Sequence, residues 1–190
     1  MFSQSLKKDL PKFPKKIGII TSLNGSVIKD LINIIRRRAS YIKLIVRDTK
    51  VNGLQSSNDL LASLDEFIEY KDVDVIIIAR GGGSFEDLMG FNSERFIRKI
   101  YECTIPIISA VGHETDFTLS DFASDFRAST PSEAAEIVCI DKVDLNFQIN
   151  TIYDNLFRLI KIKIDKNKMI FSKFLNSLTR KNNYSIFTIK

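Results

Sequence analysis

Cysteine, histidine and long apolar runs are all scarce in this sequence of 190 residues. Its two cysteines, Cys103 and Cys139, have neither a metal-ligand spacing nor the density of a disulfide framework. No run reaches the roughly 18 consecutive apolar residues that a membrane-spanning helix requires. The first residues also lack the long apolar stretch of a signal peptide. We therefore expect a cytoplasmic protein that makes no membrane contact.

Charge is distributed unevenly along the chain. Residues 1–16 contain five lysines and one acidic residue (net +4), residues 17–140 contain 13 basic and 18 acidic residues (net −5), and residues 141–190 contain 10 basic and 4 acidic residues (net +6). An acidic body between two basic segments suits a polyanion such as nucleic acid. A lysine-rich helix, however, is more often only a solvated surface.

Short apolar segments alternate with amphipathic ones between residues 17 and 111. The segments that predict strands are 17–22, 42–48, 73–79 and 105–111, and those with helical spacing of apolar residues are 26–38, about 60–68 and about 93–102. Strands that alternate with helices favour right-handed crossovers. The sequence therefore predicts an α/β fold with a doubly wound, mainly parallel sheet of four to five strands.

A long helical segment is predicted after Thr130. Thr130 and Pro131 are typical of a helix start, Glu133 stands at the capping-box position, and no proline or glycine follows up to Lys181. Apolar residues then recur at steps of four and three, as in a coiled coil: Leu145, Ile149, Ile152, Leu156 and Leu159. We expect a basic linker at 1–16, an α/β domain at 17–130, and a helical, coiled-coil-like extension at 131–190 that adds little to the sheet's core and needs a partner helix.

The only histidine, His113, follows the predicted strand at 105–111. Ligand crevices of open α/β sheets lie at the carboxyl ends of the strands, and imidazole suits proton transfer near neutrality. Glu114 and Asp116 are near enough in sequence to orient the ring or to hold a metal ion. A solvated loop histidine is the alternative.

A glycine-rich loop, Arg80-Gly81-Gly82-Gly83-Ser84, follows the most apolar strand. Its amide groups and the arginine fork form a predicted phosphate-binding loop outside the hydrophobic core. The alternative is a flexible turn with a surface arginine. Asp30, in the helix after the first strand, either complements the helix dipole or takes part in catalysis.

Further polar and aromatic residues follow His113 or surround the glycine loop. Arg127 either reaches a phosphate or pairs with an acid such as Asp121 or Asp125. The phenylalanines that interleave with these residues are more often core residues than platforms for stacking bases: Phe85, Phe91 and Phe117.

Several long motifs resemble the catalytic domain of exodeoxyribonuclease VII large subunits. They are Phe13-Pro-Lys-Lys-Ile-Gly-Ile-Ile-Thr-Ser22, Arg80-Gly-Gly-Gly-Ser-Phe-Glu-Asp-Leu88 with Phe91-Asn92, Pro106-Ile-Ile-Ser-Ala-Val-Gly-His-Glu-Thr-Asp-Phe-Thr118, and Asp121-Phe-Ala-Ser-Asp-Phe-Arg-Ala-Ser-Thr-Pro-Ser-Glu-Ala-Ala-Glu136. The resemblance is dense from about residue 11 to residue 138 and looser in the helical extension. Residues 1–16 look like the linker that would follow the OB-fold of that family, which we do not expect before Lys12.

The resemblance implies an exonuclease that hydrolyses single-stranded DNA from both ends and releases oligonucleotides. It implies catalytic roles for Asp30, Arg80, His113 and Asp116, and small helical subunits as partners on the extension. The alternative is that the apolar seam mediates self-association of the chain. No cofactor requirement is expected, although magnesium remains compatible with the carboxylates.

Two other functions remain open from the residues alone. One is a non-catalytic α/β module that binds a phosphorylated ligand at the glycine loop. The other is an assembly scaffold whose helical extension gathers partners. His113 and Asp116 distinguish the enzyme from both, because neither alternative requires them.

Overall fold

A five-stranded parallel sheet forms the centre of the α/β part of the chain. The computed structural model describes residues 2–53, 56–82, 85–112, 116–139 and 142–183. The strands are β1 (Lys16–Thr21), β2 (Lys43–Asp48), β3 (Val75–Ala79), β4 (Ile107–Ala110) and β5 (Phe126–Arg127), in the order β2-β1-β3-β4-β5. Every pairing is parallel, so the predicted doubly wound sheet is confirmed.

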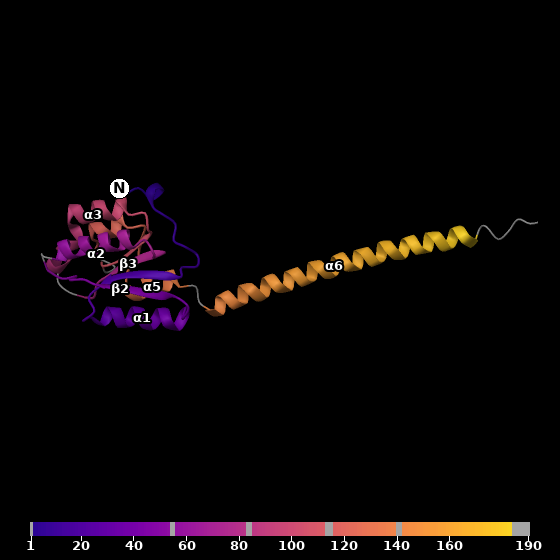
Figure 1. Cartoon of the computed structure of the whole chain (residues 1–190), viewed down its shortest axis with the longest axis horizontal. Coiled ribbons are helices and arrows are strands. Elements are labelled where there is room, and N and C mark those ends of the chain that lie inside the picture. Colours follow the sequence, from indigo (N-terminus) through magenta and orange to yellow (C-terminus); the bar gives the residue numbers. More distant parts are fainter. Residues whose placement is uncertain (1, 54–55, 83–84, 113–115, 140–141, 184–190) are drawn as a thin grey trace, which may run out of the picture. The chain divides into compact units, whose positions relative to one another are not determined.

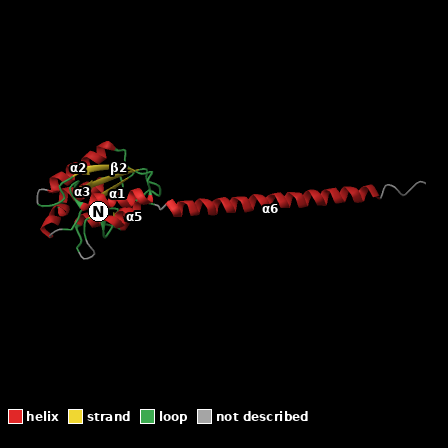
Figure 2. Ribbon diagram, turned by 90° about the horizontal axis from the view of Figure 1, so that it is seen from below, coloured by secondary structure: helices red, strands yellow, loops and turns green. Residues whose placement is uncertain are grey.

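Helices cover both faces of the sheet (Figures 1 and 2). One face packs against α1 (Ser26–Arg38) and α5 (Pro131–Val138). The other packs against α2 (Ser56–Tyr70), the 3₁₀ helix η2 (Phe85–Asn92), α3 (Glu94–Glu102) and α4 (Leu119–Ala123). A short 3₁₀ helix, η1 (Gln4–Leu6), precedes the sheet. The result is a three-layer α/β/α arrangement with one hydrophobic cluster on each side of the sheet.

The alternation of side chains along β3 determines toward which face of the sheet Arg80 points. In β3, Val75, Ile77 and Ala79 belong to the cluster under α1, whereas Ile76 and Ile78 belong to the cluster under α2 and η2. Side chains alternate between the two faces of a strand. Arg80 is therefore directed to the same face as Ile78, toward η2.

The helix α5 packs into the core of the α/β unit. Ala134, Ala135, Val138 and Cys139 belong to the hydrophobic cluster that includes α1, and the compact unit extends to Lys142. This differs from the expectation that the chain leaves the core after residue 130. The small side chains of Ala134 and Ala135 let α5 approach α1 closely, an effect that a coiled-coil repeat does not reveal. Thr130 caps α5 as expected, since its side chain accepts a hydrogen bond from the Glu133 N–H.

Hydrogen bonds attach the basic N-terminal segment to the α/β unit. The Lys8 N–H donates to the Asp125 carboxylate at 2.8 Å, and the Lys8 Nζ lies 2.9 Å from the same oxygen. The N–H groups of Lys15 and Lys16 both donate to Asp74. Residues 1–16, expected as a linker, thus make specific contacts with the domain that they precede.

The second unit contains one long helix, α6 (Lys142–Asn183). The predicted seam residues Ile149, Ile152, Leu156 and Leu159 are each more than half exposed on it. Among the described helices, none is long and apolar enough to cross a membrane.

Candidate active site at the carboxyl edge of the sheet

The strand order places a cleft beside the point where the chain changes direction across the sheet. From β1 the chain goes outward to β2 and then returns past β1 to β3. Connections on opposite sides of two neighbouring strands leave a crevice at their carboxyl ends. A cleft of ≈ 350 Å³ lies there, and its lining residues come from the ends of three strands: Thr21, Ser22, Asn24, Gly25, Ser26, Val27, Val51, Asn52, Gly81 and Gly82.

The loop between β1 and α1 forms one wall of this cleft. The Asp48 carboxylate at the end of β2 accepts a hydrogen bond from the Leu23 N–H at 2.9 Å, and the Gly25 N–H donates to the Ser22 carbonyl. Gly25 is the N-cap of α1 and has no side chain to offer the first amides of the helix. This wall therefore presents hydroxyl and backbone groups, which suit an anion.

Arg80 is buried, with only 3% of its surface exposed. Its Nε donates to the Asn52 Oδ1 at 3.2 Å, and its NH2 group lies 3.2 Å from the Asp87 Oδ2 in η2. Arg80 is therefore not a surface arginine, and the expectation that it lies outside the core is wrong. Arg80 joins the end of β3 to the cleft wall and to η2, because the alternation of β3 directs its side chain to that face.

Gly81 and Gly82 of the predicted phosphate-binding loop line the cleft directly. A Cβ on Gly82 would meet no atom within 4 Å, so the backbone there faces open space. Gly83 and Ser84 lie outside the described residues. The described part of the loop therefore presents its backbone to the cleft.

Asp116 lies at the same edge of the sheet, after β4. Ala110 of β4 pairs with Ala79 of β3, so the segments that carry Arg80 and Asp116 leave neighbouring strands. The chain turns back on itself here, since a Cβ on Gly112 would lie 2.0 Å from the Asp116 carbonyl oxygen. Asp116 is exposed, whereas His113 and its neighbour Glu114 lie outside the described residues.

Asp30 has an exposed side chain in the second turn of α1. It is not among the described residues that line the cleft, although Ser26 and Val27 of the same helix are. The structure thus places Asp30 near the N-terminal end of α1, which borders the cleft, but Asp30 itself does not line the cleft.

Two of the acidic residues after His113 have structural roles. Asp121 is 2% exposed and completes a capping box with Thr118 at the start of α4, while also accepting a hydrogen bond from Ser109 Oγ at 2.6 Å. Asp125 accepts hydrogen bonds from the Lys8 and Ile107 N–H groups. Both carboxylates are occupied in holding the chain around β4 and β5.

Phe91 and Phe117 differ in environment. Phe91 is fully buried, as predicted for a core residue, whereas Phe117 is 50% exposed and therefore is not one. The Arg127 guanidinium carbon lies 4.1 Å from the centre of the Phe117 ring. The side chain of Phe85 lies outside the described structure.

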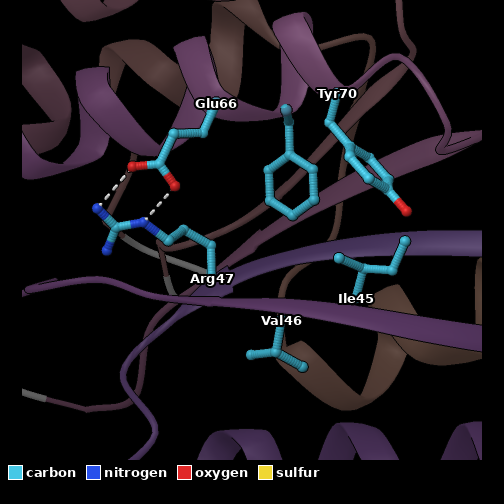
Figure 3. Close-up of a pocket in the computed structure, with 6 residues that line it drawn as sticks. Ile45, Val46, Arg47, Glu66 and Tyr70 are labelled. Atoms are coloured by element: carbon cyan, nitrogen blue, oxygen red, sulfur yellow. Dashed lines mark hydrogen bonds and ion pairs between the residues drawn. The ribbon is translucent and has the colours of Figure 1, made fainter.

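A second pocket, beside the edge strand β2, has a different chemical character (Figure 3). It has a volume of ≈ 200 Å³ between β2 and α2, and Ile45, Val46, Phe67 and Tyr70 contribute most of its lining. The Arg47 guanidinium makes two hydrogen bonds to Glu66, which lower the pKa of that carboxyl group. Its lining is mainly apolar, whereas hydroxyl, amide and backbone groups line the cleft, so the pocket is a poorer candidate for an anionic ligand.

The described residues contain no cluster of three histidine, cysteine or carboxylate side chains placed to hold a metal ion. This statement does not extend to His113 and Glu114. Sequence reasoning also missed Ser22, Asn24 and Asn52. Their signal was their position at the end of a predicted strand or within four residues after it, but only the strand order shows that the ends of β1, β2 and β3 meet at one cleft.

Comparison with known proteins identifies one family. The family model described as exonuclease VII, large subunit, matches residues 1–186. The chain is 44% identical over 156 residues to the exodeoxyribonuclease 7 large subunit of Geotalea daltonii (82% of this chain, 35% of the relative) and 44% identical over 178 residues to that of Clostridium novyi (94% and 44%). It is 42% identical over 187 residues to that of Thermoanaerobacter pseudethanolicus (96% and 47%). The chain spans less than half the length of these relatives.

Proposed function

Because the chain belongs to the family of exonuclease VII large subunits, we propose that its α/β unit hydrolyses phosphodiester bonds of single-stranded DNA. Degradation would proceed from both ends and release oligonucleotides. The observation that carries the proposal is the ≈ 350 Å³ cleft at the β1/β3 crevice, lined by Gly81 and Gly82 and bordered by the partner of Arg80, Asn52. Hydroxyl groups, backbone amides and a buried guanidinium together suit a phosphate.

Each residue has a defined task in this mechanism. Arg80 and the amides of residues 81–84 hold the scissile phosphate and stabilise the charge that develops on its oxygens. His113 takes the proton from the attacking water or gives a proton to the leaving oxygen as the P–O bond breaks. Asp116 orients His113 or positions the water, and Asp30 performs the other of these two tasks.

The reaction as proposed has no required metal cofactor. The exposed carboxylates of Asp30 and Asp116 are compatible with a magnesium ion, which needs only one or two protein carboxylates. Activity in EDTA, compared with activity in magnesium, distinguishes metal-independent cleavage from magnesium-dependent cleavage.

We further propose that α6 binds the small subunits of the enzyme. Its apolar side chains are exposed at the spacing of a coiled-coil seam, and a partner helix would bury them. Self-association through the same seam is the alternative. The lysines of this helix then either stay solvated or contact DNA: Lys161, Lys163, Lys166, Lys168 and Lys173.

One assay tests the nuclease proposal. End-labelled single-stranded DNA is incubated with the chain, with and without a small subunit, in EDTA and in magnesium. We expect Arg80→Ala, His113→Ala and Asp116→Asn each to lower cleavage by about 10²–10⁴-fold. His113→Ala should retain DNA binding, since its role is proton transfer, whereas Arg80→Ala should weaken it.

Arg98 supplies the matched control. It is an exposed arginine on α3, it is paired with Glu94, and it is not among the residues that line the cleft. Arg98→Ala should cleave like the parent. Cleavage that persists in the Arg80, His113 and Asp116 variants would contradict the assignment, and binding without cleavage in the parent would favour the phosphate-binding module instead.

A further inference from the structure

An exposed aromatic cluster follows directly after Asp116. Phe117 and Phe122 are 50% and 47% exposed, and their rings stack with centroids 5.6 Å apart and planes inclined by 23°. Arg127 lies against Phe117 and Phe2 makes an edge contact with Phe122. About half of each residue thus remains exposed although the rings contact each other and their neighbours, and phenylalanine is among the residue types that are most often buried.

Basic residues lie beside these rings. Phe2 contacts Phe122, and six residues later Lys8 is hydrogen-bonded to Asp125, in the turn between α4 and β5. The first part of the basic N-terminal segment, residues 2–8, therefore runs along the side of the unit that carries the cluster. Lys8 is paired with Asp125, which lies between α4, the helix of Phe122, and β5, the strand of Arg127.

Proteins that bind single-stranded nucleic acid combine these two features. A positively charged path follows the phosphates, and aromatic rings stack the bases without regard to sequence. Arginine beside such a ring adds a further attractive surface for a base. Arginine and phenylalanine in this arrangement thus complement both the charge and the flat faces of an unpaired strand.

We propose that Phe117 and Phe122, with Arg127 beside them, form a platform that stacks the bases of a single-stranded nucleic acid. The inference rests on the proposed function, which supplies the polymer, but it assigns residues outside the cleft. Phe117 follows Asp116 in the chain, so a base held on the platform is near the loop proposed to act on the phosphate. The platform binds the strand and takes no part in proton transfer.

The test is a binding experiment that pairs protein changes with changes in the DNA. Affinity for a fluorescent oligothymidylate and for the same oligonucleotide made of abasic units is measured by anisotropy, in a His113→Ala background that prevents cleavage. Phe117→Ala and Phe122→Ala should each weaken binding of the thymidylate by about 5- to 100-fold. They should leave binding of the abasic strand unchanged, because that strand has nothing to stack.

Controls separate stacking from structural damage. Phe117→Tyr keeps the ring and should bind like the parent, and Tyr70→Ala removes a similarly exposed ring at the β2 edge and should have no effect on either strand. Equal losses for both strands, or no binding of either strand by the parent, would overturn the inference. So would a change in the sedimentation of the DNA-free chain on Phe117→Ala, which would instead make the cluster a protein-docking surface.

The two proposals fail in distinguishable ways. Cleavage that is lost in the Arg80 and Asp116 variants, while the abasic comparison shows no difference, leaves the nuclease proposal standing and removes the platform. If instead the phenylalanine variants lose affinity only for the thymidylate strand and the parent chain does not cleave DNA, the platform stands and the nuclease proposal fails.

Discussion

Gly112 lets the backbone of Asp116 approach closely after β4, because a side chain at residue 112 would collide with it. A Cβ at this position would lie 2.0 Å from the Asp116 carbonyl oxygen and 2.7 Å from an Asp121 carboxylate oxygen. The backbone contact cannot be relieved by rotating a side chain. We therefore expect Gly112→Ala to displace Asp116, lower kcat by about 10²-fold, and lower the free energy of unfolding by about 1–3 kcal/mol. Single-turnover cleavage and urea unfolding measure the two effects.

Gly82 is the matched control at the same scale. A Cβ there would meet nothing within 4 Å, so Gly82→Ala should unfold at the same urea concentration as the parent. It lines the cleft, and an added methyl group should therefore weaken substrate binding without affecting stability. A Gly112→Ala variant as stable and active as the parent would show that the loop tolerates the displacement.

At the scale of one element, α6 exposes its apolar side chains to solvent. Ile152 is 66% exposed and Leu156 is 56% exposed, and both belong to the seam with steps of four and three residues. Replacing both with aspartate should abolish association with a small subunit or with a second copy, because buried carboxylates in a coiled coil lack partners. Sedimentation velocity measures the change.

The α/β unit provides the internal control for this substitution. Its thermal unfolding should be unchanged, since Val143–Lys190 form a separate compact unit. Replacing Lys161 and Lys168 instead should leave association intact, because neither falls on the four-and-three repeat of the seam. A parent chain that is monomeric with and without the small subunit, and indifferent to the aspartates, would rule out the seam as an interface. The lysines of α6 would then be tested for DNA contact by salt dependence, because phosphate contacts release counterions.

For the whole molecule, the boundary of the folded α/β unit determines which truncated chains still fold. A chain that ends at residue 142 retains α5 in the core, whereas one that ends at residue 130 loses Ala134, Ala135, Val138 and Cys139 from the cluster with α1. We expect the longer truncation product to unfold cooperatively like the parent and the shorter one to be destabilised, because it exposes the apolar surface of α1 and the sheet that α5 covers. Circular dichroism during urea unfolding measures the difference.

Cys139 reports on the same packing in the intact chain. It is 3% exposed, and burial raises its pKa to about 11, so at pH 8 it stays a protonated thiol. Alkylation should therefore be slow in the native protein and fast in urea. Rapid labelling of Cys139 at pH 8 without denaturant would show that α5 does not remain packed on the sheet.

The sequence by itself determined the class of fold and the edge of the sheet at which Arg80 and Asp116 lie. Apolar runs without a polar break specify buried parallel strands, and the residues that follow such strands must lie at one edge of the sheet. The positions of Arg80 and the glycine loop at the end of β3 follow from this local pattern. So does the exposed seam of α6, because a coiled-coil repeat is a property of one helix.

Only the tertiary structure decided which neighbours these residues have. The order β2-β1-β3-β4-β5 brings Asn52 and the β1–α1 loop to the cleft of Gly81, and the packing of η2 buries Arg80 against Asp87. The same packing leaves Phe117 half exposed and draws α5 into the core. These contacts join residues that are distant in sequence, and they depend on strand order and on the close approach of helices, which local periodicity does not encode.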